Sequence, residues 1–202
     1  MSRIGMLSDA ELGDLMDVIA PSRKVLGFIP NSQRIMAHKP ELLRAFAQLV
    51  GAVYGPKNSV LPAELKSMIS HVSSLTAGCM YCVAHTGSTT GRTGVEDDKI
   101  RAIWEFETSD LFTDAEKSAL RFAQAASAVP NMVTDADFED LRLHFSDVEI
   151  VEIVSVIALF GFLNRWNDTM ATSLEEEPVE FAERALAGIG WKGGKHLVPD
   201  AG

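Results

Sequence analysis

The chain has 202 residues with a formal net charge of −10, and 47% of its residues are apolar and 23% charged. This length supports a single domain with its own hydrophobic core, so folding does not require disulfides. The basic residues are scattered, which excludes the basic face typical of a nucleic-acid partner. The first nine residues contain no apolar segment of the kind found in secretory signals, so we expect none. The longest uncharged apolar run, residues 153–163, is too short to cross a membrane. We therefore expect a cytoplasmic protein.

Helical patterns extend along nearly the whole chain, and no alternating apolar run is long enough to predict a strand. Capping boxes predict helix starts at Ser8, Thr113 and Ser146, each with glutamate three residues later. Prolines at first helical positions predict helices over residues 41–54 and 63–77. Further helices are predicted near residues 114–127 and 135–144 and over 147–170, and the tail from Gly188 is predicted to be irregular. The sequence therefore predicts one all-α domain over residues 1–202.

The helix predicted over residues 147–170 is apolar around most of its circumference. Such a helix has to be buried on nearly all sides, inside the domain or at a subunit interface. We therefore expect a homo-oligomer, at least a dimer. The polar residues 164–168 near its end can cap the helix, pair with other side chains or face a site, and structural pairing is the favoured interpretation.

The two cysteines of the chain, Cys79 and Cys82, lie two residues apart, and His85 follows one helical turn later. A Cys-x-x-Cys pair can close a disulfide, and the pKa values of its thiols are usually lowered. Gly78 is expected to end the helix over residues 63–77, which places both sulfurs in the first turn of the next helix, where the helix dipole favours a thiolate. In a reducing compartment such a pair is more often catalytic or metal-binding than structural.

Helical geometry predicts different roles for the two cysteines. At about 100° per residue, Cys79 and His85 lie about 60° to either side of Cys82, so Cys82 reaches both of them. His85 can then accept a proton from Cys82. We expect Cys82 to be the attacking thiol and Cys79 the resolving thiol. Zinc bound by Cys79, Cys82 and His85 is the alternative, although three ligands on one helix is an unusual geometry.

The helix over residues 63–77 carries a polar stripe beside its apolar arc, formed by Glu64, Ser67, His71 and Ser74. Such a stripe can border a half-buried site and relay protons into it, or it can be the solvated flank of an amphipathic helix. The solvated flank is the favoured interpretation for Ser67 and Ser74. Both interpretations stay open for Glu64 and His71.

Residues 63–86, with their Cys-x-Tyr-Cys core, resemble the AhpD-like alkyl hydroperoxidases of the carboxymuconolactone decarboxylase superfamily. Residues 27–31 and 36–43 are similar to the N-terminal signature of the larger peroxidase-related members, and residues 112–116 and 164–165 are similar to their second half. The resemblance covers most of residues 20–170. It implies an AhpD-like helical bundle built around a helical hairpin that carries Cys-x-x-Cys, assembled as dimers, trimers or hexamers.

The resemblance also implies peroxide reduction through a disulfide cycle, in which the second cysteine, Cys82, reacts with the peroxide. In family members a glutamate and a histidine form the proton relay. Here Thr86 stands where the family histidine often lies, and Ser67 stands at the position of the relay glutamate. His85, one residue earlier, still reaches Cys82, and Glu64 or His71 could replace the missing carboxylate.

We therefore expect a thiol peroxidase or disulfide oxidoreductase that reduces a small hydroperoxide without a bound cofactor. Cys82 would form a sulfenic acid and Cys79 would condense with it to a disulfide. An external thiol reductant, thioredoxin-like or lipoyl-type, would then regenerate the pair. Two alternatives stay open: a carboxymuconolactone-type decarboxylase, whose chemistry uses no cysteine pair, and a non-catalytic redox-responsive or zinc-binding module.

Overall fold

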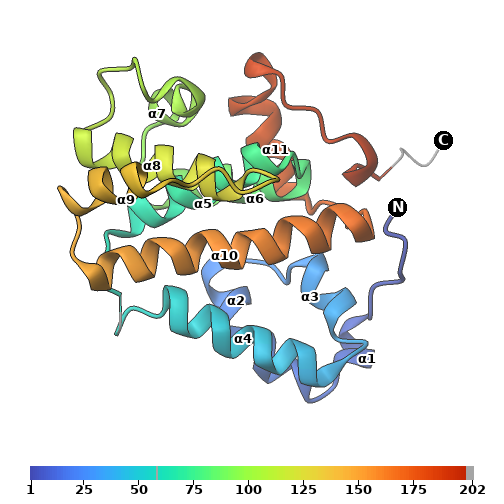
Figure 1. The fold of residues 1–202 in the computed structure, drawn as a ribbon. Coiled ribbons are helices and arrows are strands. Elements are labelled where there is room, and N and C mark those ends of the chain that lie inside the picture. Colours follow the sequence, from blue (N-terminus) through green and yellow to red (C-terminus); the bar gives the residue numbers. More distant parts are fainter. Residues whose placement is uncertain (58, 199–202) are drawn as a thin grey trace.

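The computed structural model describes residues 1–57 and 59–198 (Figure 1). In chain order the elements are α1 (Asp9–Leu12), α2 (Leu15–Leu26), α3 (Asn31–Met36), α4 (Pro40–Tyr54), α5 (Ala63–Ala77), α6 (Met80–Arg92), α7 (Asp97–Arg101), η1 (Ile103–Glu105), α8 (Asp114–Ser127), α9 (Asp135–Arg142), α10 (Asp147–Met170), α11 (Glu176–Ala185), η2 (Ala187–Ile189) and η3 (Gly194–His196). These residues contain no strand, which confirms the predicted all-α class. None of their helices is both long enough and apolar enough to span a bilayer.

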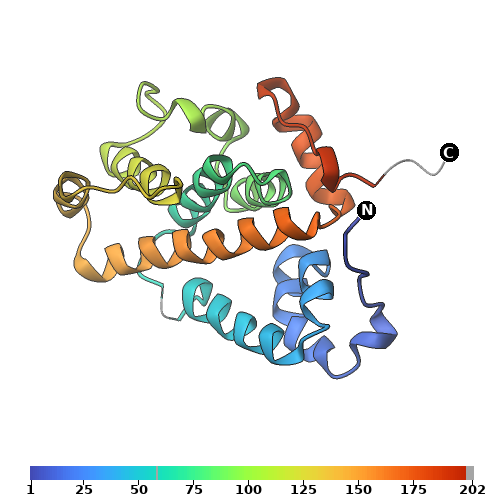
Figure 2. The ribbon, with the colours of Figure 1, turned by 45° about the vertical axis from the view of Figure 1, so that its right-hand side comes forward.

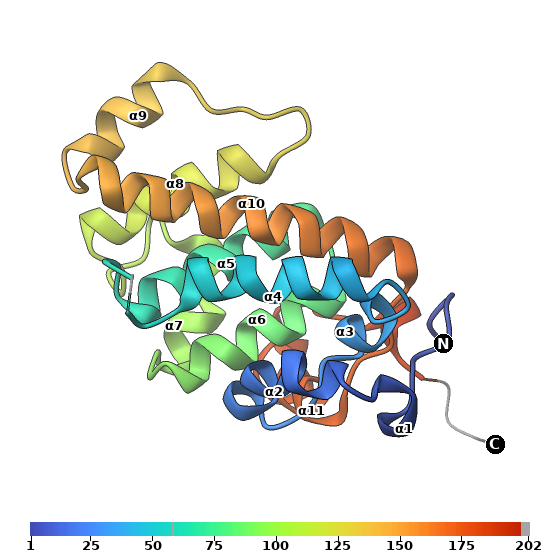
Figure 3. The ribbon, with the colours of Figure 1, turned by 90° about the horizontal axis from the view of Figure 1, so that it is seen from below.

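The long helix α10 crosses the middle of the molecule and separates two groups of helices (Figures 1 and 2). On one side lie α5, α6 and α8, and on the other lie α2, α3 and α4. Seen from below, α4 runs along α10 (Figure 3). The N-terminal segment returns to the far end of α10, where the backbone N–H of Ser2 donates to Ser173 Oγ over 3.0 Å. This contact ties the start of the chain to the connection between α10 and α11.

The centre of the fold is the hairpin of α5 and α6, which packs on α8 and α10. Gly78 ends α5 in the left-handed conformation, with φ at 71°, which glycine adopts without steric cost. Cys79 then stands at the N-cap of α6, so the expected helix break lies directly before the cysteine pair. This confirms the predicted hairpin that carries Cys-x-x-Cys.

The three capping boxes predicted from the sequence are present at the helix starts where they were expected. Ser8, Thr113 and Ser146 each form a complete capping box with the glutamate three residues later. Thr134 forms a fourth box with Asp137 before α9, which the sequence analysis missed because aspartate, not glutamate, stands at that position. Pro40 is the first residue of α4. The caps therefore fix four helix starts around the bundle.

A buried ion pair joins α5 to α10. Lys66 Nζ lies 2.9 Å from Glu152 Oε1 and donates to the carbonyl oxygen of Val53 and to Ser59 Oγ. The Lys66 side chain is 4% exposed, so its charge depends on these partners for compensation. The pair fixes the register of α5 on α10, and with it the position of the cysteines at the far end of α5.

Helix α10 is buried on one face and exposed on the other. Ile153, Val156 and Leu159 are buried, and the helix packs on α5, α6, α8 and α4. On the opposite face an apolar stripe is exposed in the single chain: Val148, Val151, Val154 and Phe162. The helix was predicted to be buried inside the domain or at a subunit interface. The domain interior buries part of its surface and leaves the apolar stripe exposed.

Helix α11 was not predicted, and it covers α6 just beyond the cysteines (Figure 1). Gly87 permits this contact, because a Cβ there would lie 2.9 Å from the Phe181 ring. Beyond α11 the described residues 188–198 make only short 3-10 turns, as predicted, and the rest of the predicted irregular tail lies outside the described residues. One of these turns, η3, returns to the start of α6 and carries His196.

Candidate functional site: a buried cysteine pair and its acid–base partners

Cys79 and Cys82 are free thiols in the first turn of α6, and both are buried. Asn167, near the end of α10, donates from Nδ2 to Cys82 Sγ over 3.5 Å. The pair therefore lies where the hairpin meets the last turns of α10. This placement puts the two predicted redox thiols side by side in the interior, at the start of α6.

The two thiols have shifted pKa values in opposite directions. Burial raises the pKa of Cys82 well above its usual value, and the hydrogen bond to Cys79 adds to this. The Cys82 side chain, as hydrogen-bond donor, lowers the pKa of Cys79, with help from the backbone N–H groups of Cys82 and Tyr81. These two directions make Cys79 the more acidic thiol of the pair. The sequence analysis expected the more acidic thiol to be Cys82.

His85 faces a carboxylate that the sequence analysis did not find. Its Nε2 lies 2.6 Å from Oε2 of Glu175, which precedes α11, and its ring stacks on Tyr81 at 4.3 Å between centroids. Tyr81 Oη donates to the other carboxylate oxygen over 2.9 Å, and the backbone N–H of Asn31 donates to it as well. Among the described residues, no hydrogen bond joins His85 to either sulfur. The imidazole is thus part of a histidine–glutamate–tyrosine network one turn beyond Cys82.

Glu175 is the charged centre of this network. Burial by itself raises the pKa of its carboxyl group, but the charge and hydrogen bond of His85 and the N–H of Asn31 outweigh that effect. The net result is a lowered pKa, so Glu175 is ionised at neutral pH. A buried carboxylate that holds an imidazole in place is a typical acid–base pair.

His71 is linked to the cysteine segment through Thr86. The Thr86 hydroxyl donates to the carbonyl oxygen of Cys82 over 2.7 Å, so its oxygen accepts from His71 Nδ1 at 2.8 Å. Burial lowers the pKa of His71 to about 4, which keeps the ring neutral at pH 7. Within the described structure the Nε2 atom has no partner. His71 is therefore linked to the Cys82 backbone only through the Thr86 hydroxyl, and within the described residues no hydrogen bond joins its ring to either sulfur.

Glu64 lies at the opposite end of α5 from the cysteines. It is exposed and borders a surface hollow of about 470 Å³, together with Lys99 and Glu116. Helical rise separates Glu64 from Gly78 by roughly 20 Å. The structure does not bring Glu64 to the cysteine pair. Ser67, at the relay-glutamate position, bonds to the Glu64 carbonyl oxygen and to Thr93.

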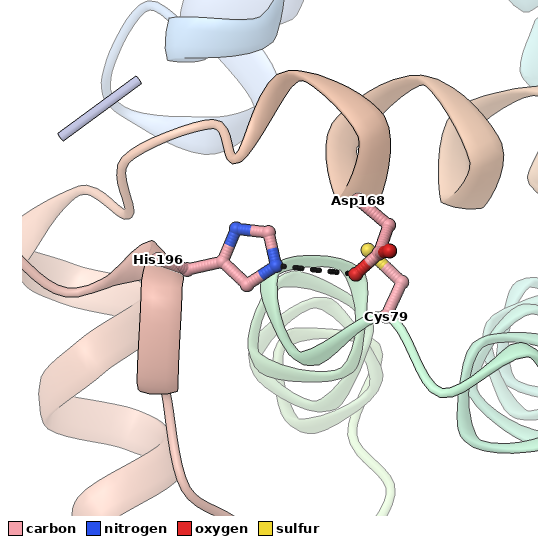
Figure 4. A group of neighbouring side chains, drawn as sticks. All are labelled: Cys79, Asp168 and His196. Atoms are coloured by element: carbon pink, nitrogen blue, oxygen red, sulfur yellow. Dashed lines mark ion pairs between the residues drawn. The ribbon is translucent and has the colours of Figure 1, made fainter. Parts of the chain in front are cut away.

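Two further polar side chains, those of Asp168 and His196, lie next to Cys79 (Figure 4). Asp168 of α10 and His196 of η3 contribute atoms that lie, with Cys79 Sγ, within 4.8 Å of one another. Structural pairing was the favoured interpretation for residues 164–168, and Asp168 does pair with Lys195 at 2.8 Å. Asn167 and Asp168 nevertheless also face the cysteine site.

The comparisons with known proteins place this arrangement in a family. The model of the carboxymuconolactone decarboxylase family matches residues 40–125, which include the whole hairpin. A crystal structure described as the alkylhydroperoxidase AhpD core of a peroxidase-related protein from Ralstonia eutropha is 26% identical, with a TM-score of 0.77 over 90% of this chain and 95% of that one. The chain belongs to the AhpD-like proteins of the carboxymuconolactone decarboxylase superfamily. The predicted resemblance is thereby confirmed.

Two further relatives show how varied these AhpD-like proteins are. The debrominase Bmp8 is 36% identical, with a TM-score of 0.83 over 89% of this chain and 96% of that one. A second structure holds a cysteine-to-alanine variant of that debrominase with 2,3,4-tribromopyrrole. The uncharacterized protein YnjA of Escherichia coli is 32% identical over 114 residues, which are 56% of this chain and 63% of that protein. The proteins to which this chain is similar therefore include one named as a debrominase and others named as peroxidase-related.

Proposed function

We propose that this AhpD-like protein is a dithiol-dependent reductase whose Cys79–Cys82 pair donates two electrons to a small hydroperoxide. The observation that carries the proposal is the placement of two free, buried thiols at the start of α6, next to the Asn167 amide and one turn before the Glu175–His85–Tyr81 network. The lowered pKa of Cys79 favours a thiolate there, and the raised pKa of Cys82 keeps its proton in place, so the pair can supply the one thiolate and the one thiol that the reaction needs.

In the first step Cys82 attacks the terminal oxygen of the hydroperoxide as its proton passes to the Cys79 thiolate. The O–O bond breaks, Cys82 becomes a sulfenic acid, and the leaving alkoxide takes a proton from His85 to give the alcohol. Glu175 holds the imidazole in place, and the Asn167 amide supports the negative charge on the Cys82 sulfur. Glu175 thereby takes the carboxylate role that neither Glu64 nor Ser67 can take from its observed position.

In the second step Cys79, deprotonated again, attacks the Cys82 sulfenic acid, and hydroxide leaves as water to give the disulfide. An external dithiol, thioredoxin-like or lipoyl-type, reduces it through a mixed disulfide. The sum is one hydroperoxide and one dithiol converted to one alcohol, one water and one disulfide. No bound cofactor takes part in these steps. A reducing cytoplasm would keep the pair in its dithiol form.

Reductive dehalogenation is a second candidate, favoured by the likeness to the debrominase over almost the whole of both chains. The electron balance is the same: a carbon–bromine bond is replaced by carbon–hydrogen, bromide leaves, and two thiols become a disulfide. His85 would donate its proton to the carbon that loses bromide. Nothing in the site geometry favours lactone decarboxylation over these two reactions.

The test is turnover by the protein with excess dithiol as reductant, with cumene hydroperoxide and 2,3,4-tribromopyrrole supplied in parallel. We expect peroxide loss that is abolished by Cys82→Ser and reduced to single-turnover or slower rates by Cys79→Ser. Bromide release without peroxide loss would replace the first candidate with the second. Turnover of a carboxylated lactone that survives thiol alkylation would contradict both.

We further propose that the protein forms a homo-oligomer through the exposed stripe of α10. Its members lie on one side of the helix: Val148, Val151, Val154 and Phe162. The exposed Ala158 lies on the turn between the last two of them. Contiguous apolar strips of this kind usually mark a protein interface. A second copy would bury the stripe by a symmetric contact.

A further inference from the structure

Three electron-pair donors converge at the start of α6, and the proposed reaction uses only one of them. Cys79 Sγ, a carboxylate oxygen of Asp168 and a ring nitrogen of His196 all lie within 4.8 Å of one another (Figure 4). They come from three separate elements: the N-cap of α6, the end of α10 and the turn η3. Cys79 and His196 are fully or almost fully buried, whereas Asp168 is half-exposed.

The hydrogen bonding of His196 determines which nitrogen faces this point. Nδ1 lies 2.8 Å from the carbonyl oxygen of Thr172, and because a carbonyl can only accept, Nδ1 carries the hydrogen. In the neutral ring Nε2 then has a free lone pair. Nε2 is buried, lies 3.7 Å from Asp168 Oδ1, and has no hydrogen-bond partner among the residues that the structure describes. An imidazole whose other nitrogen donates to a backbone carbonyl is the arrangement found in metal-binding histidines.

The spacing of these donors suits a tetrahedral metal ion. Bond lengths of about 2.0–2.3 Å to nitrogen, oxygen and sulfur place neighbouring tetrahedral ligands roughly 3.3–3.8 Å apart. The 3.7 Å between His196 Nε2 and Asp168 Oδ1 is only slightly longer than the roughly 3.3–3.5 Å of a nitrogen–oxygen pair, so a small shift of the half-exposed Asp168 side chain would bring both atoms to bonding distance. Thiolate, imidazole and carboxylate together are the ligand types of zinc. One further contact is present: Asp168 Oδ1 also accepts from Lys195 Nζ over 2.8 Å, so this ammonium group competes for the carboxylate.

We propose that Cys79, Asp168 and His196 form a binding site for a zinc-type divalent cation, with water as the fourth ligand. This donor set differs from the Cys79–Cys82–His85 set considered from the sequence. Binding releases the thiol proton of Cys79 to solvent and holds the sulfur as a metal-bound thiolate. If the proposed function is correct, the ion withdraws the resolving thiol, so that zinc blocks disulfide closure and oxidation of the pair expels the ion.

The test is a titration of the fully reduced, metal-free protein with Co²⁺, whose tetrahedral thiolate complexes absorb in the near ultraviolet and the visible. We expect one Co²⁺ per chain, displaced by Zn²⁺. Cys79→Ser should remove the sulfur-to-cobalt band, and His196→Gln should weaken binding roughly tenfold or more. Lys195→Met removes the competing ammonium group and should bind at least as tightly as the wild type.

The matched controls are Cys82→Ser and His85→Asn, which should keep both the band and the stoichiometry. Loss of the band in either control, with His196→Gln unchanged, would overturn the assignment in favour of a site on α6 alone. No band in the reduced wild-type protein would overturn it outright. The titration is done without peroxide and measures no turnover, so its result does not depend on whether the proposed activity is correct. Turnover with no response to zinc would contradict only the regulatory consequence.

Discussion

At the residue scale, the site depends on Glu175, a side chain ninety positions from the histidine it holds. Its carboxylate contacts His85, Tyr81 and the backbone of Asn31, so one group orients the imidazole and the phenol together. The lowered pKa of Glu175 keeps it charged at and below the pH of ordinary assays. We infer that this residue positions the proton donor for Cys82.

Replacement of Glu175 by glutamine keeps the shape of the side chain but removes its charge. We expect hydroperoxide turnover to fall roughly tenfold or more, because the imidazole loses the carboxylate that holds it in place. The matched control is Glu177→Gln, which removes a half-exposed carboxylate that bonds Ser88 and Arg92. Steady-state rates between pH 5 and 8 measure the effect. Equal losses in both variants would show that Glu175 acts only through the packing of α11.

At the element scale, the pairing of α5 with α6 includes a buried neutral histidine, which couples their stability to pH. The pKa of His71 is lowered from 6.5 to about 4 in the folded protein. In the unfolded chain the ring protonates near pH 6.5, so the unfolded state binds more protons as the pH falls. Stability is therefore fully present above pH 6.5 and decreases as the pH falls towards 4.

From these values the free energy of unfolding should decrease by about 2 kcal/mol between pH 7 and pH 5 through His71 alone. In His71→Asn the amide can still donate to Thr86, but no group titrates at this position. We expect that variant to lose most of the pH dependence between 7 and 5. Urea unfolding at the two pH values measures it. An unchanged pH dependence in His71→Asn would show that the ring is not the group responsible.

The elements of the fold were largely predictable, whereas the partners in the site were not. Capping boxes, prolines and Gly78 are local signals, and they marked most of the helices and the hairpin. Cys79, Cys82 and His85 were found because they lie within a few residues of one another. Glu175 and His196 lie in segments with no motif, and only the packing of α11 and η3 on α6 brings them to the cysteines. Helical spacing placed His85 near Cys82 but could not show that its ring faces a carboxylate.

At the scale of the whole molecule, α10 carries an exposed apolar stripe, although its sequence predicts a helix that is buried on nearly all sides. Within a single chain α10 packs on α5 and α8 and also on α4, but the stripe stays partly or largely exposed. The superfamily resemblance implies dimers, trimers or hexamers, and the stripe supplies an apolar surface for such a contact. The cysteine site at the end of the same helix would then lie close to an assembly interface.

A charge in the stripe should dissociate the assembly. We expect wild-type protein to be oligomeric at micromolar concentration and Val151→Glu to shift it towards the monomer, because the carboxylate would be buried without a partner. Val25→Glu on α2 is the matched control, since that valine is equally exposed but lies away from α10. Light scattering coupled to size-exclusion chromatography gives the masses. A monomeric wild type, or dissociation by both variants alike, would contradict an α10 interface.

The most direct measurement of the central claim is a single turnover without any external reductant. Fully reduced protein is mixed with one equivalent of cumene hydroperoxide, its free thiols are counted, and its peptides are mapped by mass spectrometry. We predict that two thiols disappear for each hydroperoxide consumed and that one peptide carries a Cys79–Cys82 disulfide within the same chain. Full retention of both thiols while the hydroperoxide persists, or a disulfide only between chains, would contradict the account.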